Sequence, residues 1–215
     1  MKSPEVHVID YGVGNLLSVR RGLEHCGATV VQTSDAELIL AAERVVLPGV
    51  GAYANARSAL GALGLVDVIR EIARRRIPLL GICLGMQLLL DESEEFGLTA
   101  GLGLIPGRVV NVPAKVITGE PLKIPHIGWN ALQPATAEGD WRGTVLADTC
   151  AGEAAYFVHS LMAVPAAPEH RIADCIYGGN RIPAVIGSGP ITGCQFHPEK
   201  SGEVGLRILR RFCAD

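Results

Sequence analysis

The sequence predicts an α/β fold in which a mostly parallel sheet is flanked by helices and carries an antiparallel excursion. Apolar strand-like runs alternate with helical stretches through the N-terminal half of the chain, a pattern typical of parallel sheets with helices on both faces. Glycines and prolines recur among short β-like runs over residues 101–150, which indicates the antiparallel part. Because 215 residues with 48% apolar composition supply one sizeable core, we expect a single domain over residues 1–215.

The elements of the N-terminal half follow from local signals. Residues 6–10 form an apolar first strand, Asn15 is placed to cap the helix that follows, and Gly27 ends that helix. An acidic run at 91–95 predicts a helix end or loop with mostly solvated side chains. The other expected elements here are helices at 16–26, 35–41, 55–63 and 65–76, strands at 28–33, 44–48 and 77–81, and a helix that begins after Cys83.

In the C-terminal half, the clearest signal is Gly178-Gly179-Asn180, which predicts a hairpin between two strands. Ser201 is placed to cap a final helix whose apolar residues, such as Ile208 and Phe212, share one face. The expected strands are 107–112, 131–133, 154–159, 171–177, 181–187 and 191–197.

Composition and motifs exclude several classes of protein. A net charge of −3 disfavours an electrostatic nucleic-acid binder, and the longest apolar run, 79–90, is too short to span a membrane as a helix. Six scattered cysteines fit neither a zinc site nor a disulfide framework, and no signal peptide is visible, so we expect a protein of the reducing cytoplasm. A Gly-x-Gly at 12–14 lacks the third glycine of a dinucleotide site, where Leu17 stands, and no cofactor or metal is expected.

The stretch Gly-Ile-Cys-Leu-Gly at 81–85 organises the chain. It joins an apolar strand to an apolar helix through Cys83, in the glycine-x-nucleophile-x-glycine pattern of a nucleophile elbow. Such a turn places the thiol at the carboxyl edge of the sheet and at a helix N-terminus, where the helix dipole favours negative charge. By itself the pattern fits a buried core cysteine equally well, because free cysteine is among the most buried residues.

A candidate base for the thiol favours the interpretation of Cys83 as a nucleophile. Of the six histidines, His197 is the best candidate for the base, because Pro198 biases it towards extended backbone and Glu199 then points to the same side. The carboxylate of Glu199 can hold one imidazole nitrogen and leave the other facing Cys83. Neither His126 nor His159 has a carboxylate at that offset.

Three further groups suit a site around Cys83. Gln87 lies one helical turn after the cysteine, where its amide can meet an uncharged polar substrate group or simply face solvent. The backbone amide of Leu84 follows the nucleophile, where elbow enzymes place one oxyanion donor. Gly51 can offer another such amide, because glycine lets the backbone approach a ligand closely.

Paired motifs give the chain a resemblance to a known family. Gly-Ile-Cys-Leu-Gly-Met-Gln at 81–87 together with Phe-His-Pro-Glu-Lys-Ser at 196–201 resembles class I, triad-type glutamine amidotransferases, which have a flavodoxin-like fold. More narrowly, the chain resembles the glutaminase subunits of imidazole glycerol phosphate synthases. The blocks that carry this narrower resemblance are Asp-Tyr-Gly-Val-Gly-Asn-Leu at 10–16, Leu-Pro-Gly-Val-Gly at 47–51, His-Ile-Gly-Trp-Asn at 126–130 and Tyr-Phe-Val-His-Ser at 156–160.

The resemblance implies a reaction and a partner. Cys83 would attack the side-chain amide of glutamine, while His197, oriented by Glu199, would protonate the departing ammonia and then activate water. By the same resemblance the Gly51 and Leu84 amides are the oxyanion donors, and ammonia passes to a (β/α)₈-barrel cyclase subunit that acts in histidine biosynthesis. Partner and ligand binding are expected to activate the site by rearranging the segment at 48–51. The positions implied to hold glutamine are Gly49, Gln87, Ser160 and Leu161, and those implied to lie near the partner are Tyr156 and Lys200.

Two departures and three alternatives remain. Leu161 stands where the family commonly has tyrosine, and Cys194 stands where an aliphatic residue is usual, which we interpret as packing. The chain can also be a paralogous amidotransferase that supplies a sugar-modifying or other synthase. A cysteine hydrolase or peptidase with the same triad, and a regulatory module with a dead site, are the other two alternatives.

Overall fold

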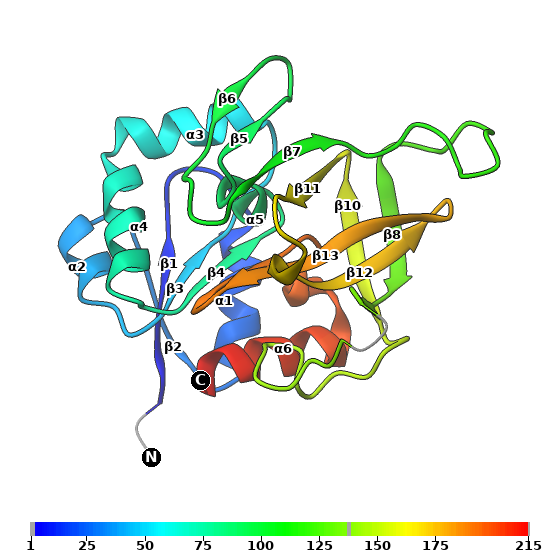
Figure 1. The fold of residues 1–215 in the computed structure, drawn as a ribbon. Helices are drawn as coiled ribbons and strands as arrows, with labels where there is room; N and C mark the ends of the chain where they lie inside the picture. The colour runs from blue at the N-terminus through cyan, green and yellow to red at the C-terminus, as the bar shows by residue number, and fades with distance from the viewer. Residues whose placement is uncertain (1–2, 137–138, 215) are drawn as a thin grey trace.

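An eight-stranded sheet forms the centre of the computed structural model, which describes residues 3–136 and 139–214. The strand order is β2-β1-β3-β4-β14-β13-β12-β9, and the first five strands are parallel while the last three are antiparallel (Figure 1). The predicted α/β class with an antiparallel part is therefore confirmed. The strands are β1 (Glu5–Ile9), β2 (Thr29–Thr33), β3 (Val45–Leu47), β4 (Leu79–Ile82), β9 (Gln133–Pro134), β12 (Arg171–Tyr177), β13 (Asn180–Ser188) and β14 (Ile191–Cys194).

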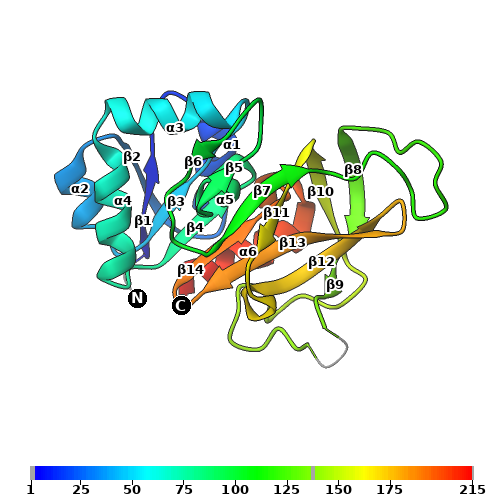
Figure 2. The same cartoon turned by 45° about the horizontal axis from the view of Figure 1, so that its top comes forward.

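Helices cover both faces of the sheet because alternate strand residues point to opposite sides. In β3, Val46 belongs to the core under α1 and α6, whereas Val45 and Leu47 belong to the core under α2, α3 and α4 (Figure 2). The predicted Asn15 cap is present, since its side chain accepts the Ser18 N–H at 3.3 Å. The helices are α1 (Leu16–His25), α2 (Ala36–Leu40), α3 (Tyr53–Ala62), α4 (Leu65–Arg74), α5 (Leu84–Leu88) and α6 (Gly202–Ala214), with 3-10 turns at Pro168–His170 and Pro198–Lys200.

The antiparallel excursion consists of two small sheets that lie beside the main one. One has the order β11-β7-β5-β6, and the other pairs β8 with β10. All of their pairings are antiparallel except that of β5 with β7. The strands are β5 (Glu92–Ser93), β6 (Thr99–Ala100), β7 (Gly107–Asn111), β8 (His126–Ala131), β10 (Ala154–His159) and β11 (Leu161–Pro165).

Four local predictions were wrong. The predicted strand at 131–133 is instead the junction of β8 and β9, and the acidic run at 91–95 contains strand β5. The last parallel strand ends at Cys194, so His197 lies in the following loop. The Ser201 hydroxyl accepts the Tyr156 N–H at 2.9 Å and donates to the His197 carbonyl at 2.6 Å, so it ties the loop to β10 rather than capping the last helix.

Two classes of feature are missing from residues 3–136 and 139–214. No helix there is long and apolar enough to cross a membrane. The same residues contain no group of three or more His, Cys, Asp or Glu side chains that could hold a metal ion.

Candidate active site

Cys83 lies in a sharp turn between strand β4 and helix α5. Its backbone has φ 54° and ψ −108°, a strained conformation for a residue with a side chain. Two glycines allow the turn: a Cβ on Gly81 would lie 2.8 Å from backbone atoms of Gly85, and a Cβ on Gly85 would lie 1.8 Å from the Leu47 carbonyl oxygen. The strand-turn-helix geometry that the motif predicts is therefore present, and Gly85 packs α5 directly against β3.

The thiol of Cys83 is mostly buried among polar groups from other strands. The side chain is 7% exposed, and its Sγ lies 3.9 Å from the Val158 carbonyl oxygen, to which it can donate. The Gln195 side-chain amide donates to the sulfur at 3.8 Å. The Cys83 backbone N–H donates to the Cys194 carbonyl at 2.7 Å, which continues the ladder between β4 and β14. These contacts fix the sulfur at the carboxyl edge of the sheet, where parallel α/β folds place their sites.

His197 and Glu199 form a buried pair. The Nδ1–H of His197 donates to Glu199 Oε1 at 2.8 Å, and the two side chains are 3% and 1% exposed. His197 is extended, as Pro198 predicts, but Glu199 reaches it because residues 198–200 form a 3-10 turn rather than a strand. The other ring nitrogen, Nε2, is buried without a hydrogen bond of normal geometry. This arrangement leaves Nε2 available to a thiol proton.

The charge state of His197 depends on its two neighbours. Burial alone lowers the pKa of the imidazole, but the side chains of Cys83 and Glu199 outweigh that effect and raise the pKa to about 9. A proton that His197 takes up is therefore held more firmly than on a free imidazole.

A cavity of about 370 Å³ opens above Cys83 and collects most of the residues that the sequence singled out. Those at its wall are Gly51, Cys83, Leu84, Gln87, Ser160, Leu161, His197 and Lys200. Glu199 is not at the wall, because it supports His197 from behind. Gly49 and Tyr156 are not at the wall either. Gly49 lies against the first turn of α5, and the Tyr156 ring meets the exposed Trp129 ring at 6.0 Å.

The backbone near Cys83 is not arranged as two free oxyanion donors. The Leu84 N–H donates to the Gly49 carbonyl at 3.3 Å, so one expected donor is already in use. The Tyr11 hydroxyl donates to the Pro48 carbonyl at 2.7 Å. Burial, and then the charge on Cys83, raise the pKa of Tyr11, so this hydroxyl keeps its proton. Hydrogen bonds to the carbonyls of Pro48 and Gly49 therefore hold the segment at 48–51 in place.

Two side chains in the cavity have surroundings that the sequence left open or did not predict. Gln87 is 4% exposed, so the solvent-facing alternative is excluded, and its amide donates to the Leu161 carbonyl at 3.2 Å and to Gln195 Oε1 at 3.1 Å. Glu95 was expected on the solvated surface but lines the cavity. One of its carboxylate oxygens accepts the Tyr53 N–H at 2.5 Å. No sequence signal separates Glu95 from the acidic residues beside it, because only the fold of β5 and the following turn decides which of them points inward.

His159 and Gln195 were also missed. His159 lines the cavity, and Gln195 contacts both the Cys83 sulfur and the Gln87 amide. Gln195 lies within the predicted strand 191–197, two positions before His197, and side chains two apart in a strand point to the same side. That spacing is the signal that could have identified Gln195.

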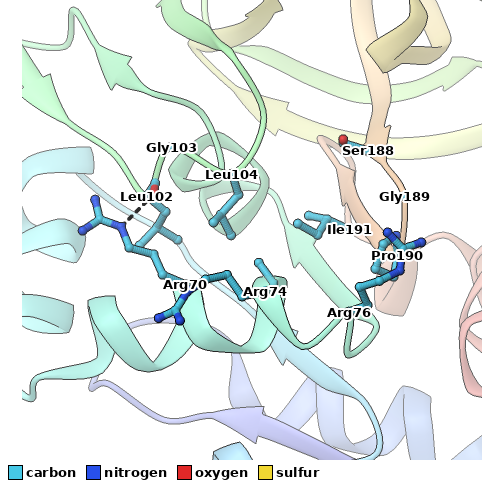
Figure 3. Close-up of a pocket in the computed structure, with 11 residues that line it drawn as sticks. Arg70, Arg74, Arg76, Leu102, Gly103, Leu104, Ser188, Gly189, Pro190 and Ile191 are labelled. Carbon is cyan, nitrogen blue, oxygen red and sulfur yellow. Dashed lines mark hydrogen bonds between the residues drawn. The ribbon is translucent and has the colours of Figure 1, made fainter.

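A second cavity lies away from this chemistry. It has a volume of about 520 Å³ and is walled by α4, by the loop at 102–104 and by the turn that leads into β14. Figure 3 shows that the guanidinium groups of Arg70, Arg74 and Arg76 point in different directions rather than toward one centre. Arg74 is paired with Glu71 at 2.6 Å, and Arg70 donates to the Leu102 carbonyl at 3.1 Å. The guanidinium groups at the wall of this cavity therefore do not converge on one ligand position.

Comparisons with known proteins agree with this geometry. The family model described as glutamine amidotransferase class-I matches residues 7–215. The chain is 50% identical over 207 residues to the "Imidazole glycerol phosphate synthase subunit HisH 1" of Legionella pneumophila (strain Lens), covering 96% of this chain and 97% of that one. It is 46% identical to the "Imidazole glycerol phosphate synthase subunit HisH" of Geobacillus thermodenitrificans (strain NG80-2), covering 96% and 94%. A crystal structure titled as a glutamine amidotransferase has the same fold, with a TM-score of 0.72, 15% identity and coverage of 98% and 99%.

Proposed function

Because the chain belongs to the class I glutamine amidotransferase family, we propose that it is the glutamine-hydrolysing subunit of an imidazole glycerol phosphate synthase in histidine biosynthesis. Residues 1–215 act as one amidotransferase domain. The observation that supports this function best is the arrangement of Cys83 in a strained elbow beside a buried His197–Glu199 pair, at the wall of one cavity.

The reaction begins with transfer of the Cys83 proton to His197 Nε2 and attack of the sulfur on the amide carbon of glutamine. The carbonyl oxygen becomes an oxyanion, and the C–N bond breaks as His197 returns the proton to the nitrogen, which leaves as ammonia. His197 then takes a proton from water, whose oxygen attacks the thioester carbon. The C–S bond breaks and the sulfur recovers a proton from His197, which gives glutamate and the free enzyme. Glu199 keeps the proton on Nδ1 throughout, so that Nε2 does the transfers.

The oxyanion donors are not both free at rest. The Leu84 amide and an amide of the 48–51 segment, such as that of Gly51, are the proposed donors, but the Leu84 amide is bonded to Gly49. The site therefore rests in a form of low activity. Displacement of the 48–51 segment on binding of substrate and partner releases the Leu84 amide, and each donor gained lowers the barrier by about 3 to 4 kcal/mol.

Free glutamine also carries an ammonium and a carboxylate, and the cavity has groups of suitable charge. Glu95 places a carboxylate at the wall with one oxygen not used by Tyr53, which suits the ammonium. Gln87 and the backbone of Ser160 and Leu161 line the part of the cavity next to the sulfur and hold the rest of the substrate. Gly49 contributes through its contact with the α5 turn rather than from the wall. Since only backbone of Leu161 is needed, the absence of tyrosine there has little cost.

The partner is a cyclase subunit with a (β/α)₈-barrel fold, and it docks where ammonia leaves the site. Strand β8 presents Ile127 and Trp129, which are 55% and 59% exposed, and the Trp129 ring contacts Tyr156. Lys200 connects this face to the cavity wall. Exposed apolar side chains beside a cavity mark interaction sites, so we place the docking face on Ile127, Trp129, Tyr156 and Lys200. The two chains form a heterodimer through which ammonia is channelled.

The test is a glutaminase assay of the chain alone and with a purified histidine-pathway cyclase. We expect slow release of glutamate by the chain alone and a large increase with the cyclase. Mass spectrometry after treatment with a glutamine-derived electrophile should find the label on Cys83. Activation only by a sugar-modifying synthase would support the paralogue instead, and cleavage of peptides without use of free glutamine would support a peptidase.

A further inference from the structure

Two buried histidines lie side by side between the small β8–β10 sheet and the cavity. The antiparallel register pairs His126 of β8 with His159 of β10, and the two side chains are 2% and 6% exposed. His126 Nδ1 and His159 Nε2 are 3.0 Å apart, which is a hydrogen bond. Neither histidine takes part in the reaction written above.

The direction of the hydrogen bond between the two histidines follows from the contact of the other ring nitrogen of His159. His159 Nδ1 lies 2.7 Å from the Leu161 carbonyl oxygen, which can only accept, so Nδ1 carries the proton. Burial lowers the pKa of both histidines to about 4, and each ring is therefore neutral at pH 7 with a single N–H. The Nε2 of His159 must then accept from His126 Nδ1–H, and His126 Nε2 accepts from the Asn130 amide at 3.4 Å. The hydrogen bonds from Asn130 through His126 and His159 thus run in a single direction and end at the Leu161 carbonyl, which accepts the last of them.

The chain ends on an atom that the substrate site also uses. The Leu161 carbonyl accepts the Gln87 amide at 3.2 Å as well as the His159 N–H, so both of its lone pairs are occupied. Gln87, His159 and Leu161 all line the cavity above Cys83, whereas His126 does not. The hydrogen bond to His159 therefore links His126 to the cavity.

We propose that His126 and His159 are positioning residues for glutamine binding, and that their one-directional hydrogen-bond chain holds the Leu161 carbonyl and, through it, the Gln87 amide in the orientation that receives the substrate. The inference rests on the proposed function for the identity of the substrate. A packing role would be different. His126 stacks on Tyr177 with ring centroids 4.0 Å apart, and any flat ring could provide that contact.

The first experiment reads the tautomers without any assay of activity. Two-bond ¹H–¹⁵N correlation NMR of the histidine-labelled chain at pH 7 should find both His126 and His159 neutral with the proton on Nδ1, assigned by the loss of signals in single variants. A proton on Nε2, or a charged ring, at either residue would overturn the proposal. The result stands whatever the catalytic function of the chain proves to be.

The second experiment separates positioning from packing, with the chain in complex with its cyclase partner. His126→Phe keeps a flat ring against Tyr177 but has no N–H, so we expect KM for glutamine to rise about five- to tenfold, the effect of one lost hydrogen bond, with kcat nearly unchanged. His126→Asn retains a donor at the place of Nδ1 and should recover most of the affinity. His170→Phe is the matched control. The Nδ1 of His170 also forms a hydrogen bond with a backbone carbonyl, that of Gly187 at 2.9 Å, but His170 is not at the cavity wall.

An unchanged KM in His126→Phe, or an equal rise in His170→Phe, would contradict the proposal. If His126→Phe does not fold, as judged by its thermal unfolding, the His126→Asn variant and the tautomer measurement decide. A wild-type complex that does not hydrolyse glutamine would refute the proposed function, and the tautomers would still report on the hydrogen-bond chain.

Discussion

Replacement of Glu199 by glutamine tests the role of the His197–Glu199 pair with the smallest change in shape. The carboxylate accepts the His197 Nδ1–H at 2.8 Å with both side chains almost fully buried. A glutamine amide can turn its NH₂ group toward Nδ1, which moves the imidazole proton to Nε2. His197 would then face Cys83 as a donor and could not take the thiol proton.

The size of the effect follows from that geometry. A placed general base contributes about 100- to 10,000-fold in rate, and a base held in the wrong tautomer loses most of it. We therefore expect kcat for glutamate release in the partner complex to fall about 100- to 10,000-fold, with KM for glutamine nearly unchanged because Glu199 is not at the cavity wall. Glu203→Gln is the control, since this carboxylate also forms an ion pair, with Arg210 at 2.6 Å, but on the surface of α6.

Glu199 also links stability to pH. Because the pKa of His197 is raised from 6.5 to about 9, its contribution to the free energy of unfolding is fully present below pH 6.5 and is lost as the pH rises through 9. Glu199→Gln should reduce this loss, which chemical denaturation of the isolated chain at pH 6 and pH 9.5 can measure. Wild-type kcat in Glu199→Gln, or the same decrease in Glu203→Gln, would show that another group orients His197.

Three other substitutions probe the elbow, the substrate site and the resting segment. Gly85→Ala should destabilise the chain by more than about 3 kcal/mol or prevent folding, because its Cβ would lie 1.8 Å from the Leu47 carbonyl oxygen; a normal denaturation midpoint would contradict this. Glu95→Gln should raise KM for glutamine about tenfold or more with little change in kcat, and an unchanged KM would remove Glu95 from the ammonium site. Tyr11→Phe should raise the glutaminase rate of the chain without partner about fivefold, since it removes one hydrogen bond from the Pro48 carbonyl; an unchanged or lower rate would show that Tyr11 does not restrain the resting segment.

The sequence predicts the N-terminal half of this fold well because its signals are local. Apolar strands, the Asn15 cap and the glycines around Cys83 each specify their own neighbourhood. The antiparallel part is less predictable, since its short strands are defined by pairing with distant segments. Strand β8, for example, exposes the apolar side chains of Ile127 and Trp129, and its place follows from its register with β10.

The same distinction applies to the candidate site. The residues with a chemical signature in the sequence, Cys83, His197 and Glu199, are in fact brought together. Glu95 and His159 have no such signature, because whether their side chains point inward is decided by tertiary packing. The hydrogen bond from Leu84 to Gly49 could not be predicted from the sequence either, because no local signal indicates which conformation the 48–51 segment adopts at rest.

The pairing of β4 with β14 has a consequence for how such a chain can change. Cys83 and Gln195 are 112 positions apart, yet the register that sets Ile82 opposite Cys194 puts the nucleophile and the loop of the base at the ends of two adjacent strands. One backbone ladder therefore sets the distance between the strand ends that carry the thiol and the imidazole. The outer face of β8, which is proposed for the cyclase, lies in a separate two-stranded sheet, so substitutions on that face can alter the docking of a synthase and leave this ladder unchanged.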